Sequence, residues 1–215
     1  MPRLVTVVPS ILTDDPEALE RMVRQAEGFT DYVQFDIMDG QFVPSRSIAW
    51  QHLMALETKL VWEAHLMVQH PENYVEGFAE AGAKKIIFHF EADTSPEAVI
   101  SKSTDLGMKV GLAVNPETRV ADFIGLTEKV DSILFLSVHP GFYGSPFIPE
   151  VLSKVTELRN SVSQADIGID GGIKEGNIEQ VARTGVDAIY LGSAIFLQSN
   201  PAARYRQLVK LAREA

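Results

Sequence analysis

The alternation of short β-branched runs with amphipathic segments is the feature that most restricts how this chain can fold. Eight such runs occur, at residues 4–8, 32–36, 60–65, 85–89, 109–113, 133–137, 166–170 and 188–191. Each is followed by a segment with apolar residues at helical spacing, and prolines at Pro16, Pro71 and Pro201 suit the first turn of a helix. Strands that alternate with helices are typical of a parallel α/β sheet.

The number of strand-helix units favours a closed barrel. Eight units in 215 residues, roughly 27 residues each, predict one α/β domain over residues 1–215, a (β/α)8 barrel of the TIM type. The competing fold is a doubly wound open sheet, which normally has about six strands and a glycine-rich first turn. Here the first turn reads Pro-Ser-Ile-Leu from Pro9 and contains no glycine.

Composition excludes several classes of protein. A chain that is 46% hydrophobic and 22% charged suits a globular domain with a substantial core. A net charge of -10, without any cluster of Lys or Arg, argues against a nucleic-acid surface. No apolar run is long enough to span a membrane, no signal peptide is evident, and cysteine is absent. We therefore expect a cytoplasmic protein that binds neither membranes nor nucleic acids.

Polar residues follow most of the predicted strands. The carboxyl ends of all strands in a parallel barrel share one rim, so these side chains are expected to converge there. The predicted rim carries Ser10, Asp36, His65, His89, Asn115, His139, Asp170, Gly192 and Ser193. A carboxylate at the end of a core strand is costly to bury without a metal, a cation or a proton-transfer role. The sequence therefore predicts that the chemistry centres on Asp36 and Asp170.

Glycines in three loops predict how the rim binds an anion. Gly171 and Gly172 follow the seventh strand, and Gly192 with Ser193 follows the eighth. Barrels commonly bind a phosphate with backbone N–H groups of these two loops, because glycine lets the anion approach the amides. The glycine-rich segment 137–147 after the sixth strand is long enough to form a lid, or else it is a structured surface loop.

Seven motifs in this order and spacing strongly resemble ribulose-phosphate 3-epimerase over essentially the whole chain. They are Pro9-Ser-Ile-Leu, Asp36-Ile-Met-Asp-Gly-Gln-Phe-Val-Pro, His65-Leu-Met, Asn115-Pro-Glu-Thr, Ser137-Val-His-Pro-Gly-Phe, Asp170-Gly-Gly-Ile and Gly192-Ser-Ala-Ile-Phe. The resemblance implies a barrel of the ribulose-phosphate-binding type that acts on a small sugar phosphate in carbohydrate metabolism. It also implies a homo-oligomer and no organic cofactor.

The implied reaction interconverts D-ribulose 5-phosphate and D-xylulose 5-phosphate by inverting C3 through an enediolate. The resemblance makes Asp36 and Asp170 the acid/base pair, since inversion removes a proton from one face and returns one to the other. It implies substrate contacts at Ser10, His65, Met38 and Met67. It assigns phosphate binding to Gly141, Gly144, Gly171, Gly172, Gly192 and Ser193.

The family also implies a divalent metal (Zn, Fe, Mn, Co or Mg) held by two histidines and two aspartates. Asp36, His65 and Asp170 match three of these ligands, but Gln34 stands at the position of the fourth. Glutamine is a weaker donor to zinc or iron than imidazole, so we expect weaker transition-metal binding or a preference for a harder ion. The loop after the sixth strand also departs from the family pattern, at His139, Tyr143 and Ser145.

These departures leave three alternatives open. The substrate could be another ketose phosphate, such as a ketohexose 6-phosphate, because the altered residues border the sugar chain. The protein could also bind a phosphosugar without turnover, although two facing carboxylates beside an anion would then have little use. A phosphosugar decarboxylase is less well supported, because its Asp-x-Lys-x-x-Asp element is absent.

Overall fold

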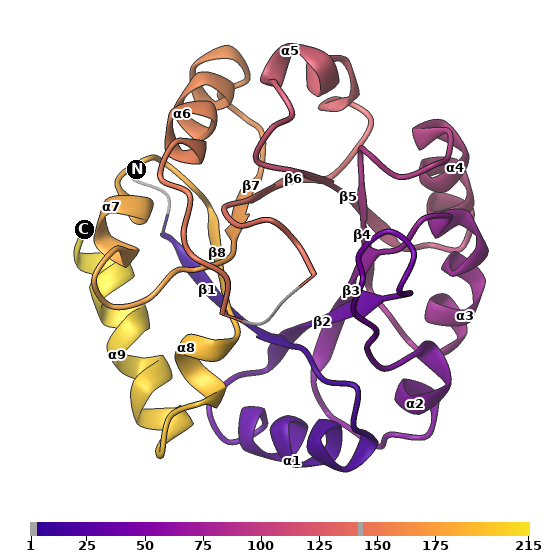
Figure 1. Ribbon diagram of the computed structural model, residues 1–215, viewed down its shortest axis with the longest axis vertical. Helices are drawn as coiled ribbons and strands as arrows, with labels where there is room; N and C mark the ends of the chain where they lie inside the picture. Colours follow the sequence, from indigo (N-terminus) through magenta and orange to yellow (C-terminus); the bar gives the residue numbers. More distant parts are fainter. Residues whose placement is uncertain (1–3, 142–143) are drawn as a thin grey trace.

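The computed structural model describes residues 4–141 and 144–215, so Tyr143 lies outside the described residues. Eight parallel strands form a closed barrel in sequence order, and β8 pairs with β1 (Figure 1). The predicted TIM-type barrel is therefore confirmed. The strands are β1 (Thr6–Ile11), β2 (Tyr32–Met38), β3 (Val61–Met67), β4 (Lys85–His89), β5 (Lys109–Val114), β6 (Ser132–Leu136), β7 (Ile167–Asp170) and β8 (Ala188–Leu191).

Helices form a ring around the barrel (Figure 1). The α1 helix shows why they begin where they do: the Asp15 side chain accepts a hydrogen bond from the N–H of Glu17, and Pro16 occupies the first turn. The described helices are α1 (Pro16–Ala26), α2 (Trp50–Met54), η1 (Pro71–Asn73), α3 (Val75–Glu80), α4 (Pro96–Asp105), α5 (Val120–Phe123), η2 (Ile124–Leu126), α6 (Val151–Ser161), α7 (Ile178–Ala182), α8 (Ser193–Phe196) and α9 (Pro201–Glu214). None of these described helices is long and apolar enough to cross a membrane.

The first three strands run further than their apolar runs suggest, which corrects the predicted bounds. The β1 strand begins at Thr6, where it pairs with β8, and continues to Ile11. Asp36 pairs in register with His65, so both lie inside β2 and β3. The sequence placed them at the ends because polar residues normally end a strand. Here the ladder continues past them, since their side chains find polar partners inside the barrel.

Strand alternation divides the core into two parts. The larger apolar cluster lies between the strands and the helices, whereas a smaller one of Val8, Ile87, Ala113, Leu134, Leu136 and Tyr190 faces the barrel interior. One inward-facing group is charged: Lys85 Nζ lies 3.3 Å from Glu63 Oε2, and the Tyr32 hydroxyl donates to the same oxygen at 2.8 Å. The barrel interior therefore holds both apolar and charged side chains beneath the rim.

Candidate active site

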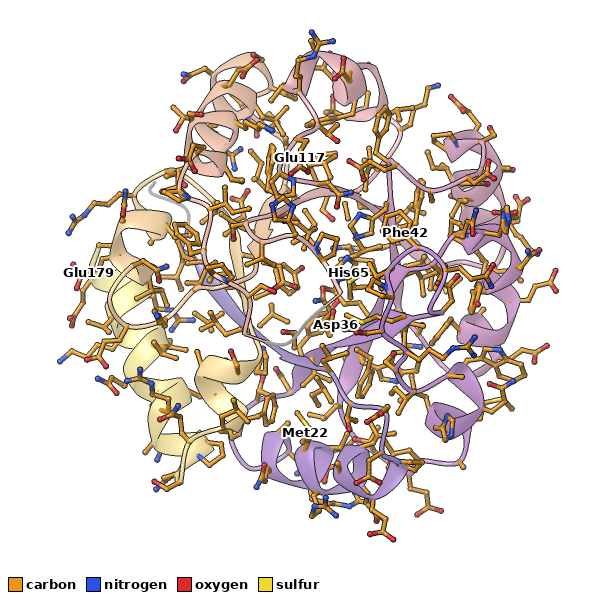
Figure 2. All side chains as sticks on the ribbon, viewed as in Figure 1. Met22, Asp36, Phe42, His65, Glu117 and Glu179 are labelled. Atoms are coloured by element: carbon orange, nitrogen blue, oxygen red, sulfur yellow. The ribbon has the colours of Figure 1, made fainter. Side chains whose placement is uncertain are left out.

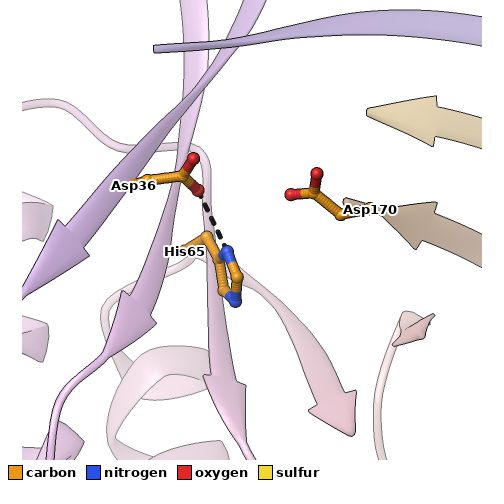
Figure 3. A group of neighbouring side chains, drawn as sticks. All are labelled: Asp36, His65 and Asp170. Atoms are coloured by element: carbon orange, nitrogen blue, oxygen red, sulfur yellow. Dashed lines mark hydrogen bonds and ion pairs between the residues drawn. The ribbon is translucent and has the colours of Figure 1, made fainter. Parts of the chain in front are cut away.

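Two buried aspartates and one histidine converge at the rim of the barrel (Figure 3). Asp36 comes from β2, His65 from β3 and Asp170 from the end of β7, so the two carboxylates face each other across the mouth. One ligand atom from each of the three lies within 4.8 Å of the others. Figure 2 shows Asp36 and His65 near the barrel axis, whereas Glu179 on α7 lies on the outer ring.

Gln34 lies inside the barrel and joins the two carboxylates. Its side-chain nitrogen Nε2 donates to Asp36 Oδ1 and to Asp170 Oδ2, each at 3.0 Å. The other amide atom, Oε1, is buried and has no hydrogen-bond partner among the described residues. Sequence reasoning considered Gln34 only as a doubtful metal ligand through its oxygen. In the structure it presents a hydrogen-bond donor to both acids.

The surroundings of Asp170 shift its pKa into the range that suits proton transfer. Burial first, and then the negative charges of Asp36 and Glu63, raise the pKa of Asp170 to about 7, against the opposing effects of His65 and Gln34. Near neutral pH this carboxyl can therefore both release and accept a proton. Such a carboxyl beside a second one is what proton transfer on both faces of a substrate requires.

A second histidine lies behind His65, away from the cleft. His65 Nδ1 is 3.0 Å from Asp36 Oδ1, and its Nε2 is 3.0 Å from Nε2 of His89. His89 Nδ1 is in turn 3.3 Å from Glu91 Oε2. Sequence reasoning placed His89 at the rim and missed Glu91. The signal was the spacing of two residues, which puts both side chains on one face of the chain at the end of β4.

Every residue predicted to bind substrate or phosphate lines one cleft with the two aspartates. These residues are Ser10, Met38, His65, Met67, Gly141, Gly144, Gly171, Gly172, Gly192 and Ser193. Tyr190, which sequence reasoning did not consider for the site, lines it as well. Three predicted rim residues, His89, Asn115 and His139, are absent from the described lining. The His139 side chain is 72% exposed, and its Nδ1 lies 3.1 Å from Glu117 Oε1.

Tight packing among the glycine loops shapes the mouth of the cleft. Gly172 has φ +66°, and a Cβ there would lie 2.7 Å from the backbone nitrogen of Phe147. A Cβ on Gly141 would lie 3.0 Å from Val43 in the loop after β2. The segment after β6 therefore reaches from the β2 loop to the β7 loop, over one side of the cleft. Ser137 holds its start by donating a hydrogen bond to the carbonyl oxygen of Asp170 at 2.9 Å.

The donor set fits a divalent cation in part. Two carboxylates and one imidazole nitrogen converge within metal-ligand reach at Asp36, His65 and Asp170. Gln34 does not complete the set as it stands, because its amide nitrogen, which cannot bind a metal, faces the carboxylates. The structure is thus consistent with a metal held by three side chains.

Two comparisons of the sequence with known proteins give the same family. The profile of the "Ribulose-phosphate 3 epimerase family" matches residues 6–196. The ribulose-phosphate 3-epimerase of Synechocystis is 40% identical over 93% of this chain and 91% of that protein. The enzyme of that name from Mycobacterium tuberculosis H37Rv is 38% identical over 92% of this chain and 88% of its own length.

Solved structures share the fold at low sequence identity. The 3-hexulose-6-phosphate synthase of Salmonella typhimurium superposes with a TM-score of 0.73 at 16% identity, over 98% of this chain and 99% of that one. At that identity the likeness shows the barrel architecture alone.

Proposed function

The chain belongs to the ribulose-phosphate 3-epimerase family and epimerises a carbohydrate phosphate, and we propose that the reaction runs between Asp36 and Asp170. The substrate in this proposal is D-ribulose 5-phosphate and the product D-xylulose 5-phosphate. The observation that carries the proposal is the pair of buried carboxylates facing each other across one cleft, with burial raising the pKa of Asp170 to about 7.

Each aspartate serves one face of the substrate. One ionised carboxylate removes the proton from C3, and the electron pair of the broken C–H bond forms the enediolate as charge moves to the carbonyl oxygen. The opposite carboxylic acid then delivers its proton to the other face of C3, which inverts the carbon. Because β2 and β7 lie on different sides of the mouth, Asp36 and Asp170 can do this without moving the sugar.

A divalent metal at Asp36, His65 and Asp170 would stabilise the negative charge of the enediolate oxygens. We propose that binding of zinc, iron, manganese, cobalt or magnesium is weak here, because Gln34 replaces a fourth ligand. The hydrogen bonds from Gln34 Nε2 support this view, since they hold the two carboxylates in place without a cation.

The phosphate group is proposed to bind at the loops after β7 and β8. Gly172 and Ser193 line the same cleft as the aspartates, and Ser193 begins α8. The loop at Gly172 packs closely against the backbone of Phe147, which leaves no room for a side chain there. Ser10, Met38 and Met67 then surround the sugar between the phosphate and the acid pair.

The test is conversion of ribulose 5-phosphate in deuterated water, followed by NMR with and without a chelator. We expect formation of xylulose 5-phosphate with deuterium at C3, and only a partial loss of rate when a chelator is added. A ketohexose 6-phosphate in parallel assays reports the substrate preference. Absence of both turnover and exchange with ribulose 5-phosphate would overturn the proposal.

Two further expectations concern the protein in its cell. We propose that it acts in the cytoplasm, from its family and from a composition without cysteine, and that it forms a homo-oligomer, from its family alone. Light scattering coupled to gel filtration measures the mass of the assembly against the 23.7 kDa of one chain.

A further inference from the structure

The side chain of Asp39 joins the loop after β2 to the loop after β3. Backbone pairing between these two strands ends at Met38 and Met67. Just beyond that pair, Asp39 Oδ2 accepts a hydrogen bond from the backbone N–H of Gln69 at 2.8 Å. The carboxylate therefore continues the contact between the two chain segments after the strands have ended.

The other oxygen of Asp39 holds the turn that follows β2. Asp39 Oδ1 accepts hydrogen bonds from the backbone N–H groups of Gln41, at 2.8 Å, and Phe42, at 2.9 Å. Three backbone donors thus meet one half-buried carboxylate, and hydrogen bonds to an ionised acceptor are stronger than those between neutral groups. Asp39 therefore holds the turn together and also ties it to the end of β3.

This turn carries apolar side chains that form one wall of the cleft. Met38, Val43 and Met67 make a small buried cluster, and Phe42 packs against it. Met38 and Met67 line the cleft that also contains the two catalytic aspartates. Val43 reaches the segment after β6, because a Cβ on Gly141 would lie 3.0 Å from it. The position of the wall thus depends on the turn.

We propose that Asp39 is a positioning residue that holds the wall formed by Met38 and Met67 against the sugar chain of the substrate. Asp39 is not part of the described lining of the cleft, so it acts through the two methionines. The acids themselves are fixed by strand pairing at Asp36 and Asp170. A loosened wall should therefore weaken sugar binding more than it slows proton transfer. The identity of the sugar rests on the proposed function, whereas the hydrogen bonds of Asp39 do not.

The variant Asp39→Asn tests the link between the two loops with little change of shape. Its single amide oxygen can keep both N–H groups of the turn, so its NH2 group faces the N–H of Gln69 and that hydrogen bond is lost. The KM for ribulose 5-phosphate should rise about 10-fold, while kcat stays within about 3-fold of wild type. Exchange of the Gln69 amide hydrogen, followed by NMR, should become at least about 10-fold faster.

Asp131→Asn is the matched control. Asp131 Oδ2 accepts a hydrogen bond from the backbone N–H of Val110 at 2.7 Å, but this contact lies near the start of β5, at the opposite end of the barrel. A variant that is only less stable contains fewer folded molecules, which lowers the apparent kcat and leaves KM unchanged. Asp131→Asn should therefore keep the wild-type KM even where its stability falls.

Two results would overturn the inference. One is a Gln69 amide that exchanges in the wild-type protein as fast as an unprotected amide, which can be measured even if Asp39→Asn fails to fold. The other is a folded Asp39→Asn protein whose KM is unchanged, or whose KM changes no more than that of Asp131→Asn. A wild-type protein that protects the Gln69 amide but does not convert ribulose 5-phosphate would contradict the proposed function instead.

Discussion

Asp36 and Asp170 are alike in chemistry but differ in environment, and each is proposed to carry one proton of the reaction. Asp36→Asn and Asp170→Asn should each reduce epimerisation by roughly 10²- to 10⁴-fold, because each removes one proton carrier. The rate is measured with ribulose 5-phosphate, and circular dichroism checks the fold. Asp105→Asn, at the exposed end of α4, is the control and should keep the normal rate. Near-normal turnover of either active-site variant would remove the two-acid mechanism.

The raised pKa of Asp170 predicts how the stability of the protein depends on pH. A carboxyl whose pKa rises from about 3.9 in the unfolded chain to about 7 in the fold disfavours folding once it is ionised. This loss of stability is absent at a pH below the pKa of Asp170 in the unfolded chain. It grows as the pH rises through the pKa of Asp170 in the folded protein. Asp170→Asn, which has no charge, should therefore unfold at least about 3 °C higher than wild type at pH 8. Near pH 4 the two should unfold together.

Thermal scans with chelator, at both pH values, make this comparison. The chelator is needed because a bound cation would itself stabilise the ionised carboxylate. An equal difference between the two proteins at pH 4 and pH 8 would show that the charge of Asp170 is not the cause.

Gln34 is the residue at which the family resemblance and the local chemistry diverge. Gln34→His removes the amide donor and supplies an imidazole beside Asp36, His65 and Asp170. Imidazole is a better ligand for a borderline metal, so zinc affinity should rise and activity should become more sensitive to chelator. Calorimetric zinc titration of both proteins measures the change. A tight, stoichiometric zinc in the wild type would contradict the expectation.

At the scale of elements, the loops that join the strands to α7 and α8 form the proposed phosphate site. Gly172→Ala should raise KM for the sugar phosphate and lower stability. Its φ of +66° disfavours a side chain, and the new Cβ would lie 2.7 Å from the backbone of Phe147. The left-handed conformation alone disfavours alanine by about 1 kcal/mol. Kinetics and urea unfolding measure the two effects.

Gly176→Ala is the matched control in the same loop, because a Cβ there meets no atom within 4 Å. It should leave both KM and stability unchanged. Equal effects of the two substitutions would show that the close packing of Gly172 against Phe147 does not shape the site.

At the scale of the whole molecule, Glu63 on β3 contacts Lys85 on β4 and Tyr32 on β2, and so links three strands inside the barrel. Glu63→Gln leaves the buried ammonium of Lys85 without its counter-charge, so the free energy of unfolding should fall by about 3–5 kcal/mol. Urea unfolding measures the fall. Glu179→Gln, which breaks an exposed pair with Arg183, should have no measurable effect. An intact stability in Glu63→Gln would show that the pairing of Lys85 with Glu63 does not stabilise the barrel.

Local patterns in the sequence determined the strand-helix alternation, the family, and the acids and glycines of the cleft. They could do so because strand and helix periodicity, helix caps and loop glycines depend on neighbours a few residues apart. The bounds of β1 to β3 were wrong because polar residues inside a barrel look like strand ends in a sequence. His139 was predicted at the rim, but its side chain is exposed beside Glu117, a contact between two loops that no local pattern encodes.

Only the tertiary structure decided which polar atoms meet. Gln34 and Asp170 are 136 residues apart, and their hydrogen bond exists because ring closure brings β2 and β7 to face each other. The link from Glu91 through His89 to His65 likewise depends on adjacent strands, and the raised pKa of Asp170 depends on burial that no local pattern encodes. The sequence determines which residue types are present. Whether a polar side chain donates a hydrogen bond, accepts one or carries a charge depends on the groups that the fold places within about 3 Å of it.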